Sequence, residues 1–203
     1  MTNPTQNHSR NILRIGWIIA CSVGASCAIA LAMIIFSITE TERDFVLLRL
    51  FVGAVLAGLS LGGLQALVLR RRGVRIARWM TASVLGAVGG SWLLVLIVSG
   101  MQLDGFDETS LGVNVLLGGG FGFCFGAVVG ALQWVGGGRM LSARHWIAAN
   151  MAGWMPAMAI IIAGGALTTP AQPFPIIVLA GTIIGGIAGV ALGVVTSVAL
   201  PTR

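Results

Sequence analysis

The chain has 203 residues, of which 57% are hydrophobic and only 9% are charged. Its mean hydropathy is +0.97, and 30 of its residues are glycine, roughly double the usual share. This composition excludes a soluble globular domain, a disordered chain and a disulfide scaffold, and it predicts an integral membrane protein.

Six apolar stretches follow one another along the chain, at residues 15–38, 45–69, 76–99, 111–135, 146–167 and 174–200. Each has the roughly 20 residues that a helix needs to cross the hydrocarbon core of a bilayer. The stretches are continuous rather than alternating, which favours helices over the strands of a membrane barrel. The sequence therefore predicts an all-α polytopic fold: a single six-helix domain over 15–200, an N-terminal tail at 1–14 and a C-terminus at 201–203.

Basic and acidic residues fall in different loops. The arginines that flank the spans or lie in the termini are Arg10, Arg14, Arg70, Arg71, Arg72, Arg75, Arg78, Arg139, Arg144 and Arg203. The acids occupy the alternate loops, at Glu40, Glu42, Asp44, Asp104, Asp107 and Glu108. The positive-inside rule then predicts a multi-pass protein of the bacterial cytoplasmic membrane with both termini in the cytoplasm.

The net charge of +6 comes from these arginines. Because arginines beside apolar spans set topology, we expect no nucleic-acid partner. The lipid bilayer is the expected partner, and Arg70, Arg71 and Arg72 are the best candidates for contact with anionic headgroups.

The chain also repeats itself internally. The pattern G-x-x-x-G-x-L-Q ends at Gln65 and again at Gln133, and a tryptophan follows each copy at Trp79 and Trp146. Each tryptophan is followed by Ala at +3, a polar residue at +4 (Ser83 and Asn150) and Gly at +7. Thr196 in the sixth span and Trp17 in the first occupy the matching positions. This predicts three two-helix units, from spans two and three, four and five, and six and one, about a pseudo-threefold axis along the membrane normal.

The even-numbered spans carry small residues four positions apart, which places them on one helix face. They are Ala54, Gly58, Gly62, Gly118, Gly122, Gly126, Gly130, Gly181, Gly185, Gly189 and Gly193. Such faces are typical of close helix packing, and packing is the favoured interpretation. The alternative is a pore or ligand groove lined by exposed backbone.

Two sets of residues near the arginine-rich ends of the spans have predicted roles. Gln65, Gln133 and Thr196 are interpreted as interhelical glue, with Ser83 or Asn150 as a bonding partner. A polar ring around a substrate path is the alternative. The tryptophans, Trp17, Trp79 and Trp146, are predicted to anchor the protein at the membrane interface.

Little in the chain indicates chemistry. His8 and His145 lie on the opposite side of the membrane from the acids, so we expect no enzyme, no cofactor and no bound metal. The acidic loop at residues 104–108 is interpreted as a solvated turn, with a divalent-cation site as the alternative.

Arg49 is the one clearly intramembrane charge. It lies about 6 Å past Phe45, near the outer end of the second span. We expect its long side chain to snorkel to the interface and pair with Asp44 or Glu42. A substrate site is the alternative, because intramembrane charges are often functional.

The segment from Gly126 to Gln133 and Trp134, with a basic loop and then Trp146-x-x-Ala149-Asn150, resembles a group of uncharacterised multi-pass membrane proteins of bacteria. These proteins, seen especially in cyanobacteria and Chloroflexota, repeat a G-x-x-x-G-x-x-Q-W…W-x-x-A unit. The resemblance covers most of spans two to six and departs from the pattern at Ala66 and Thr196. It implies a multi-pass fold and no particular activity.

The leading functional hypothesis is a non-catalytic accessory or structural subunit of a membrane assembly, with other membrane proteins or further copies of the chain as partners. The alternative is a small-solute transporter or channel along the pseudo-threefold axis. A continuous cavity faced by Gln65, Gln133 and Thr196 would favour the alternative.

Overall fold

The computed structural model describes residues 4–38, 46–100, 110–138, 141–168 and 172–200. These residues form six long α-helices and one short 3-10 turn: α1 (Pro4–Ile38), α2 (Val46–Arg70), α3 (Ile76–Gly100), α4 (Leu111–Gly137), α5 (Ala143–Ala166), α6 (Phe174–Thr196) and η4 (Ser197–Ala199). All six helices are long and apolar enough to cross a membrane. The prediction of an all-α fold with six spans is confirmed.

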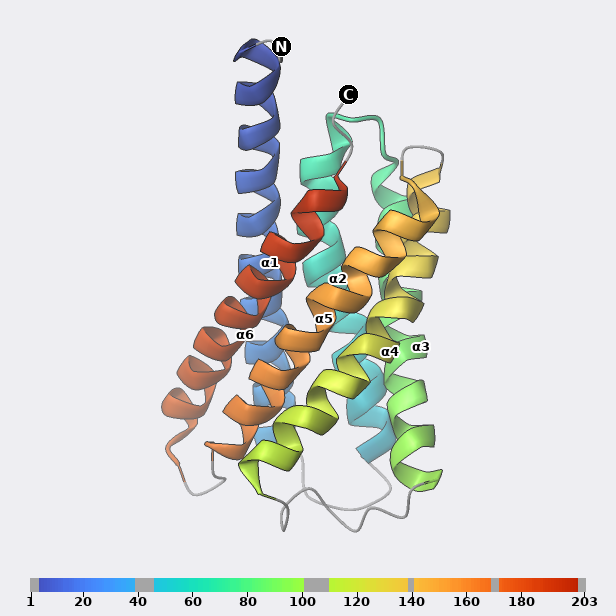
Figure 1. Ribbon diagram of the computed structural model, residues 1–203. Helices are drawn as coiled ribbons and strands as arrows, with labels where there is room; N and C mark the ends of the chain where they lie inside the picture. Colours follow the sequence, from blue (N-terminus) through green and yellow to red (C-terminus); the bar gives the residue numbers. More distant parts are fainter. Residues whose placement is uncertain (1–3, 39–45, 101–109, 139–140, 169–171, 201–203) are drawn as a thin grey trace.

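The N-terminal helix is longer than the first predicted span. It begins at Pro4, so most of the segment predicted as an N-terminal tail is the first part of α1. Proline suits a first helical turn, and neither glycine nor proline interrupts the chain from there to Gly16. The helix of the apolar span therefore propagates back through the polar segment, and its first turns project beyond the rest of the bundle (Figure 1).

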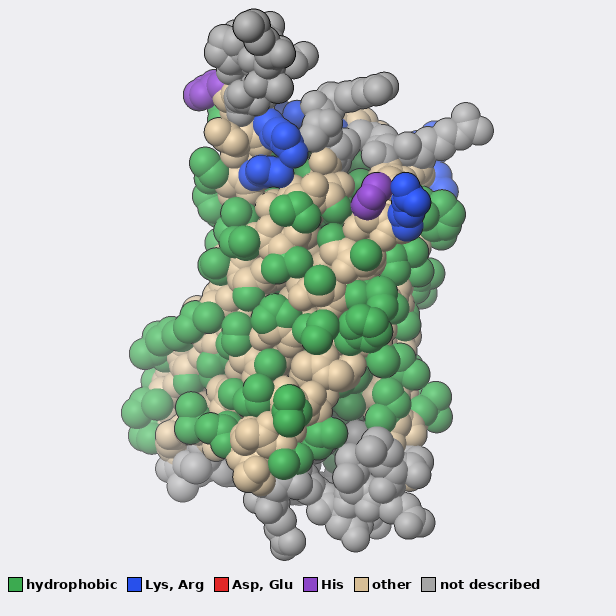
Figure 2. Space-filling model, in the orientation of Figure 1, with side chains coloured by type: hydrophobic (Ala, Val, Ile, Leu, Met, Phe, Trp, Pro, Cys, Tyr) green, Lys and Arg blue, Asp and Glu red, His purple; other side chains and the backbone are tan. Residues whose placement is uncertain are grey.

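The six helices form a closed ring in which each packs against its neighbours in sequence, and α6 packs against α1. Both termini lie at the same end (Figure 1). The described arginines of the helix ends and connecting turns gather at that end, hereafter the basic end, and a broad apolar surface lies beyond it (Figure 2). All six acids, Arg139 and Arg203 lie outside the described residues.

The glycine faces lie at close approaches between helices. A Cβ atom added at Gly126 would lie 2.5 Å from the carbonyl oxygen of Asn150 on α5, closer than real Cβ contacts. A Cβ would meet a neighbouring helix at 3.0 Å or less at Gly58, Gly62, Gly118, Gly122, Gly130, Gly181, Gly185, Gly189 and Gly193 as well. The absence of a side chain at these positions is therefore what allows the helices to approach. Ala54, the remaining member of the predicted set, lines a cavity described below.

One contact recurs in three helix pairs. In each pair, a glycine of the even-numbered helix meets the residues four and five positions after the tryptophan of the odd-numbered helix. The three contacts are Gly58 on Ser83 and Val84, Gly126 on Asn150 and Met151, and Gly189 on Cys21 and Ser22. The α2–α3, α4–α5 and α6–α1 pairs thus share this local packing.

Candidate functional site

Three tryptophans from alternate helices of the ring meet inside the bundle near its basic end. The side chains of Trp17, Trp79 and Trp146 are 0%, 0% and 1% exposed. Their ring centroids lie 5.7 to 6.3 Å apart, and each pair meets edge to face. Each such pair stabilises by about 0.5–1.5 kcal/mol beyond the area that it buries. The three indoles therefore fill the centre of the bundle at this level.

The prediction that these tryptophans are interfacial anchors is wrong. Their depth, just inside the arginine-rich end, agrees with the prediction, but their side chains point into the bundle rather than to lipid. The reason lies in the helix face. Trp79 shares its face with the small buried residues Ala82, Ser83 and Gly86, and that face packs against the other helices. The small residues three, four and seven positions after Trp79 were the sequence signal that this tryptophan lies on a buried face.

A network of hydrogen bonds joins the glutamines to these helices. Gln133 Nε2 donates to Gln65 Oε1 and to Ser83 Oγ, both at 3.1 Å. Gln65 Nε2 in turn donates to Cys21 Sγ at 3.4 Å, which links α1 to α2, α3 and α4. Asn150 donates instead to the carbonyl oxygen of Trp146 in its own helix, at 3.0 Å. Ser83, and not Asn150, is therefore the bonding partner of Gln133.

The indole N–H groups extend the network unequally. Two of them donate to the polar residue of the even-numbered helix in the same pair: Trp17 to Thr196 at 2.8 Å, and Trp79 to Gln65 at 3.4 Å. In the third pair, Trp146 Nε1 and Gln133 Oε1 are buried and have no partner among the described residues. These two atoms are a donor and an acceptor, so the third pair lacks the bond that joins the indole to the polar residue in the other two pairs.

We call this layer the plug; its members are Trp17, Trp79, Trp146, Gln65, Gln133, Thr196, Ser83 and Cys21.

Replacing Gln133 by leucine is expected to lower the free energy of unfolding by about 1 kcal/mol, because two interhelical bonds average about 0.6 kcal/mol each. Unfolding in mixed micelles measures the change. Ser60→Ala is the control, because the Ser60 hydroxyl bonds only within α2. A Gln133→Leu variant as stable as the parent would contradict the glue role.

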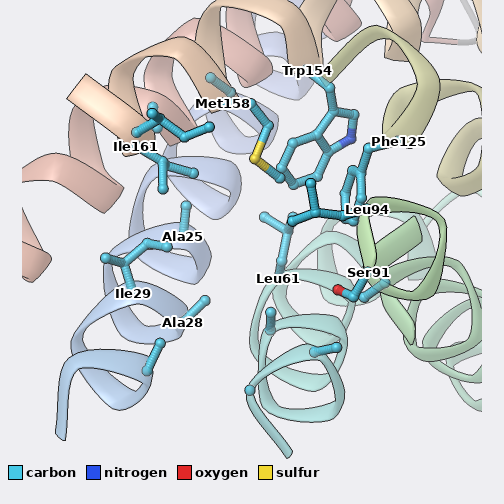
Figure 3. A pocket seen from close by; sticks show the side chains of 18 of the residues that line it. Ala25, Ala28, Ile29, Leu61, Ser91, Leu94, Phe125, Trp154, Met158 and Ile161 are labelled. Carbon is cyan, nitrogen blue, oxygen red and sulfur yellow. The ribbon is translucent and has the colours of Figure 1, made fainter. Parts of the chain in front are cut away.

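A cavity of about 270 Å³ lies beyond the plug, away from the basic end. All six helices line it, through side chains that include Ala28, Ala54, Ala87, Phe125, Trp154 and Ala188. Figure 3 shows Trp154, Met158 and Ile161 of α5 over a space bordered by α1 on one side and by α2 and α3 on the other. Alanines from several helices line this space, and their short side chains leave it unfilled. We call it the chamber.

Arg49 lines the chamber. Its side chain is 5% exposed, and its Nε and Nη2 atoms are buried with no partner among the described residues. The prediction that Arg49 snorkels to the interface is wrong, because it shares the inward face of α2 with Gly53 and Ala57, one and two turns further on. The predicted partners, Glu42 and Asp44, lie outside the described residues.

The wall of the chamber also contains residues that the sequence did not single out. Trp154 packs edge to face on Phe125, with ring centroids 4.7 Å apart, and its Nε1 is buried without a partner among the described residues. Trp154 follows Gly153 on α5 and does not belong to the repeated tryptophan and polar positions. Its place in the chamber wall is therefore seen only in the assembled bundle.

The remaining predicted residues lie at the ends of the bundle. Arg70 is the last residue of α2, and Arg70 and Arg71 are exposed at the basic end. The turn that follows needs Gly73, whose φ of 85° is one that side-chain-bearing residues rarely adopt. Contact of this turn with lipid headgroups stays a prediction. The acidic loop at 104–108 lies outside the described residues.

Comparison of the chain with family models, with curated proteins and with solved structures gives no match. The resemblance to repeat-containing bacterial membrane proteins therefore stays a prediction.

Proposed function

We propose that this chain is a non-catalytic membrane protein of the small-solute transporter class, and that its solute binds in the chamber. One observation carries this proposal: a cavity lined by all six helices contains a buried guanidinium, that of Arg49, with two unpartnered donor atoms among the described residues. Intramembrane charges that face the interior of a bundle commonly mark substrate paths.

Two energetic costs, those of the unfilled chamber and of the intramembrane arginine, favour a transporter over a structural subunit. The small side chains around the chamber leave about 270 Å³ that larger side chains could fill, and the bundle forgoes the packing stability that such filling brings. An arginine inside a membrane span adds about 3 kcal/mol on insertion scales. A purely structural bundle would remove both penalties by filling the chamber with larger side chains and replacing Arg49. A bound solute offsets them.

The plug distinguishes a carrier that is closed at one end from an open channel. Gln65 and Thr196 bond to tryptophans within the plug, and neither they nor Gln133 line the chamber. The condition that would have favoured a channel along the axis, a continuous cavity faced by these three residues, is therefore not met among the described residues. The bundle is therefore closed at its basic end, as in a carrier with one gate shut, rather than an open channel. With the arginines in the cytoplasm, the chamber lies in the half of the bundle nearer the outside of the cell. The recurring glycine contacts support three equivalent helix pairs, which would move relative to one another to open the plug.

Cysteine labelling tests whether the chamber admits solutes. Gly53 lines the chamber, and a Cβ added there meets nothing within 4 Å, so Gly53→Cys places a thiol in the cavity without distorting the helix. The variant is made after replacing Cys21 by serine and Cys27 and Cys124 by alanine. We expect a membrane-impermeant maleimide, applied from outside to cells, to label this thiol.

The matched control is Leu179→Cys on α6, which is 60% exposed on the apolar surface at a similar distance from the end of its helix. This thiol faces lipid and is expected to stay unlabelled, because maleimides react with thiolates in water. If Gly53→Cys and Leu179→Cys are both unlabelled, the chamber is closed to water and the accessory-subunit hypothesis becomes the better one.

A further inference from the structure

The chamber has the shape of a chain rather than of a compact solute. Along α2 its lining runs from Arg49 to Leu61, which are twelve residues apart and hence roughly 18 Å along the helix axis. Along α1 it runs from Ala25 to Phe36, roughly 16 Å by the same measure. Both lengths are measured along helix axes, so the chamber is elongated parallel to the helices.

The chemistry of the wall changes along this length. At the end nearest the plug, Leu61 and Leu192 line the chamber and belong to the buried cluster that also contains the plug tryptophans. This end of the chamber is therefore closed by apolar side chains. The middle of the wall is formed by alanines and by apolar side chains such as Phe125 and Met158. Arg49 lies at the other end, one turn from the start of α2, and is the only charged residue of the described lining.

The free donors of Arg49 have the geometry of an oxyanion site. Nε and Nη2 present parallel N–H bonds along one edge of the guanidinium, the arrangement that binds a carboxylate or a phosphate through two hydrogen bonds. Both of these atoms are buried and lack a partner among the described residues. The low polarity of the surrounding wall strengthens such a pair.

We propose that the chamber binds a single-chain amphiphile with an anionic oxygen headgroup, its head on Arg49 and its hydrocarbon chain directed toward the plug. This inference rests on the proposed function and specifies the class of solute. Fatty acids and monoalkyl phosphates share this chemistry.

Binding of radiolabelled palmitate to the full-length protein in nanodiscs of zwitterionic lipid tests the proposal. We expect saturable binding at one site per chain, competition by a monoalkyl phosphate and none by palmityl alcohol. Arg49→Gln is expected to weaken binding by roughly thirty-fold or more, because it removes one partner of a desolvated charge pair. Arg49→Lys keeps the charge without the paired donors and is expected to lie between the two.

A second variant tests the position of the chain. Gly53→Leu fills open space in the chamber and is expected to abolish palmitate binding without loss of folding, whereas Gly120→Leu, on the exposed face of α4, is expected to leave it unchanged. Saturable binding of a radiolabelled monoalkyl phosphate, with no binding of palmitate, would identify a phosphate headgroup as the natural source and support the shared chemistry.

Equal binding of palmitate by the parent, Arg49→Gln and Gly53→Leu would overturn the proposal. The same holds if palmityl alcohol competes as well as palmitate does. If Gly53→Cys is labelled by the impermeant maleimide while neither anionic amphiphile binds, the ligand class is wrong and the proposed function stands. If that thiol is not labelled, the proposed function itself fails.

Discussion

Replacing Gly126 by alanine is expected to lower the free energy of unfolding by about 1–3 kcal/mol, the usual range for overpacking. The added Cβ would lie 2.5 Å from the carbonyl oxygen and 2.8 Å from the carbonyl carbon of Asn150. Backbone atoms of α5 cannot rotate away as the end of a side chain can, so the two helices must separate. Unfolding by denaturing detergent in mixed micelles measures the loss.

One control variant and two equivalent variants are compared with Gly126→Ala. Gly120→Ala on the same helix adds a Cβ that meets nothing within 4 Å, and it is expected to stabilise by up to about 1 kcal/mol through helix propensity. Gly58→Ala and Gly189→Ala, which make the corresponding contacts, are expected to behave like Gly126→Ala. A loss confined to one of the three positions would contradict the equivalence of the helix pairs.

Replacing Trp79 by alanine is expected to have a larger effect, a loss of about 3–5 kcal/mol. The Trp79 side chain is fully buried, contacts the rings of both Trp17 and Trp146, and donates to Gln65. Its removal leaves a cavity at the centre of the plug and a glutamine oxygen with one bond fewer. The measurement is again unfolding in mixed micelles.

Trp92→Ala is the matched control because it removes a tryptophan from the same helix. Trp92 is 46% exposed on the apolar surface, so its replacement is expected to cost about 1 kcal/mol or less. If the two variants lose similar stability, the central tryptophan cluster is not the main contact of this layer and the account of the plug is wrong.

The sequence was sufficient to predict the helices but not their rotation. Apolar length predicts a span directly, and the starts of α3, α4 and α6 agree with the predicted starts to the residue. The neighbouring arginines also place Trp79 near the basic end of the bundle. Which way a side chain points at a given depth depends on the neighbouring helices, so Trp79 was expected to face lipid and faces the core. A uniformly apolar helix gives little periodic contrast to reveal its buried face.

The chamber was beyond the reach of the sequence for a different reason. A cavity is volume left between side chains of several helices, and no single span shows that Ala28, Ala87 and Ala188 line the same gap. Arg49 could have been assigned, because it lies on the same face as Gly53 and Ala57 at a four-residue spacing. Glu42 and Asp44 lie close to Arg49 in the sequence and favoured the prediction of an ion pair at the interface. The position of Arg49 on the face of Gly53 and Ala57 was the better guide.

Native mass spectrometry on the protein released from its own membrane in mild detergent tests the central claim most directly. The account predicts a bundle that carries a small amphiphilic molecule in the parent protein and lacks it in Arg49→Gln. A stoichiometric protein partner, with no small molecule bound to either form, would contradict the account and support a structural subunit of a larger assembly.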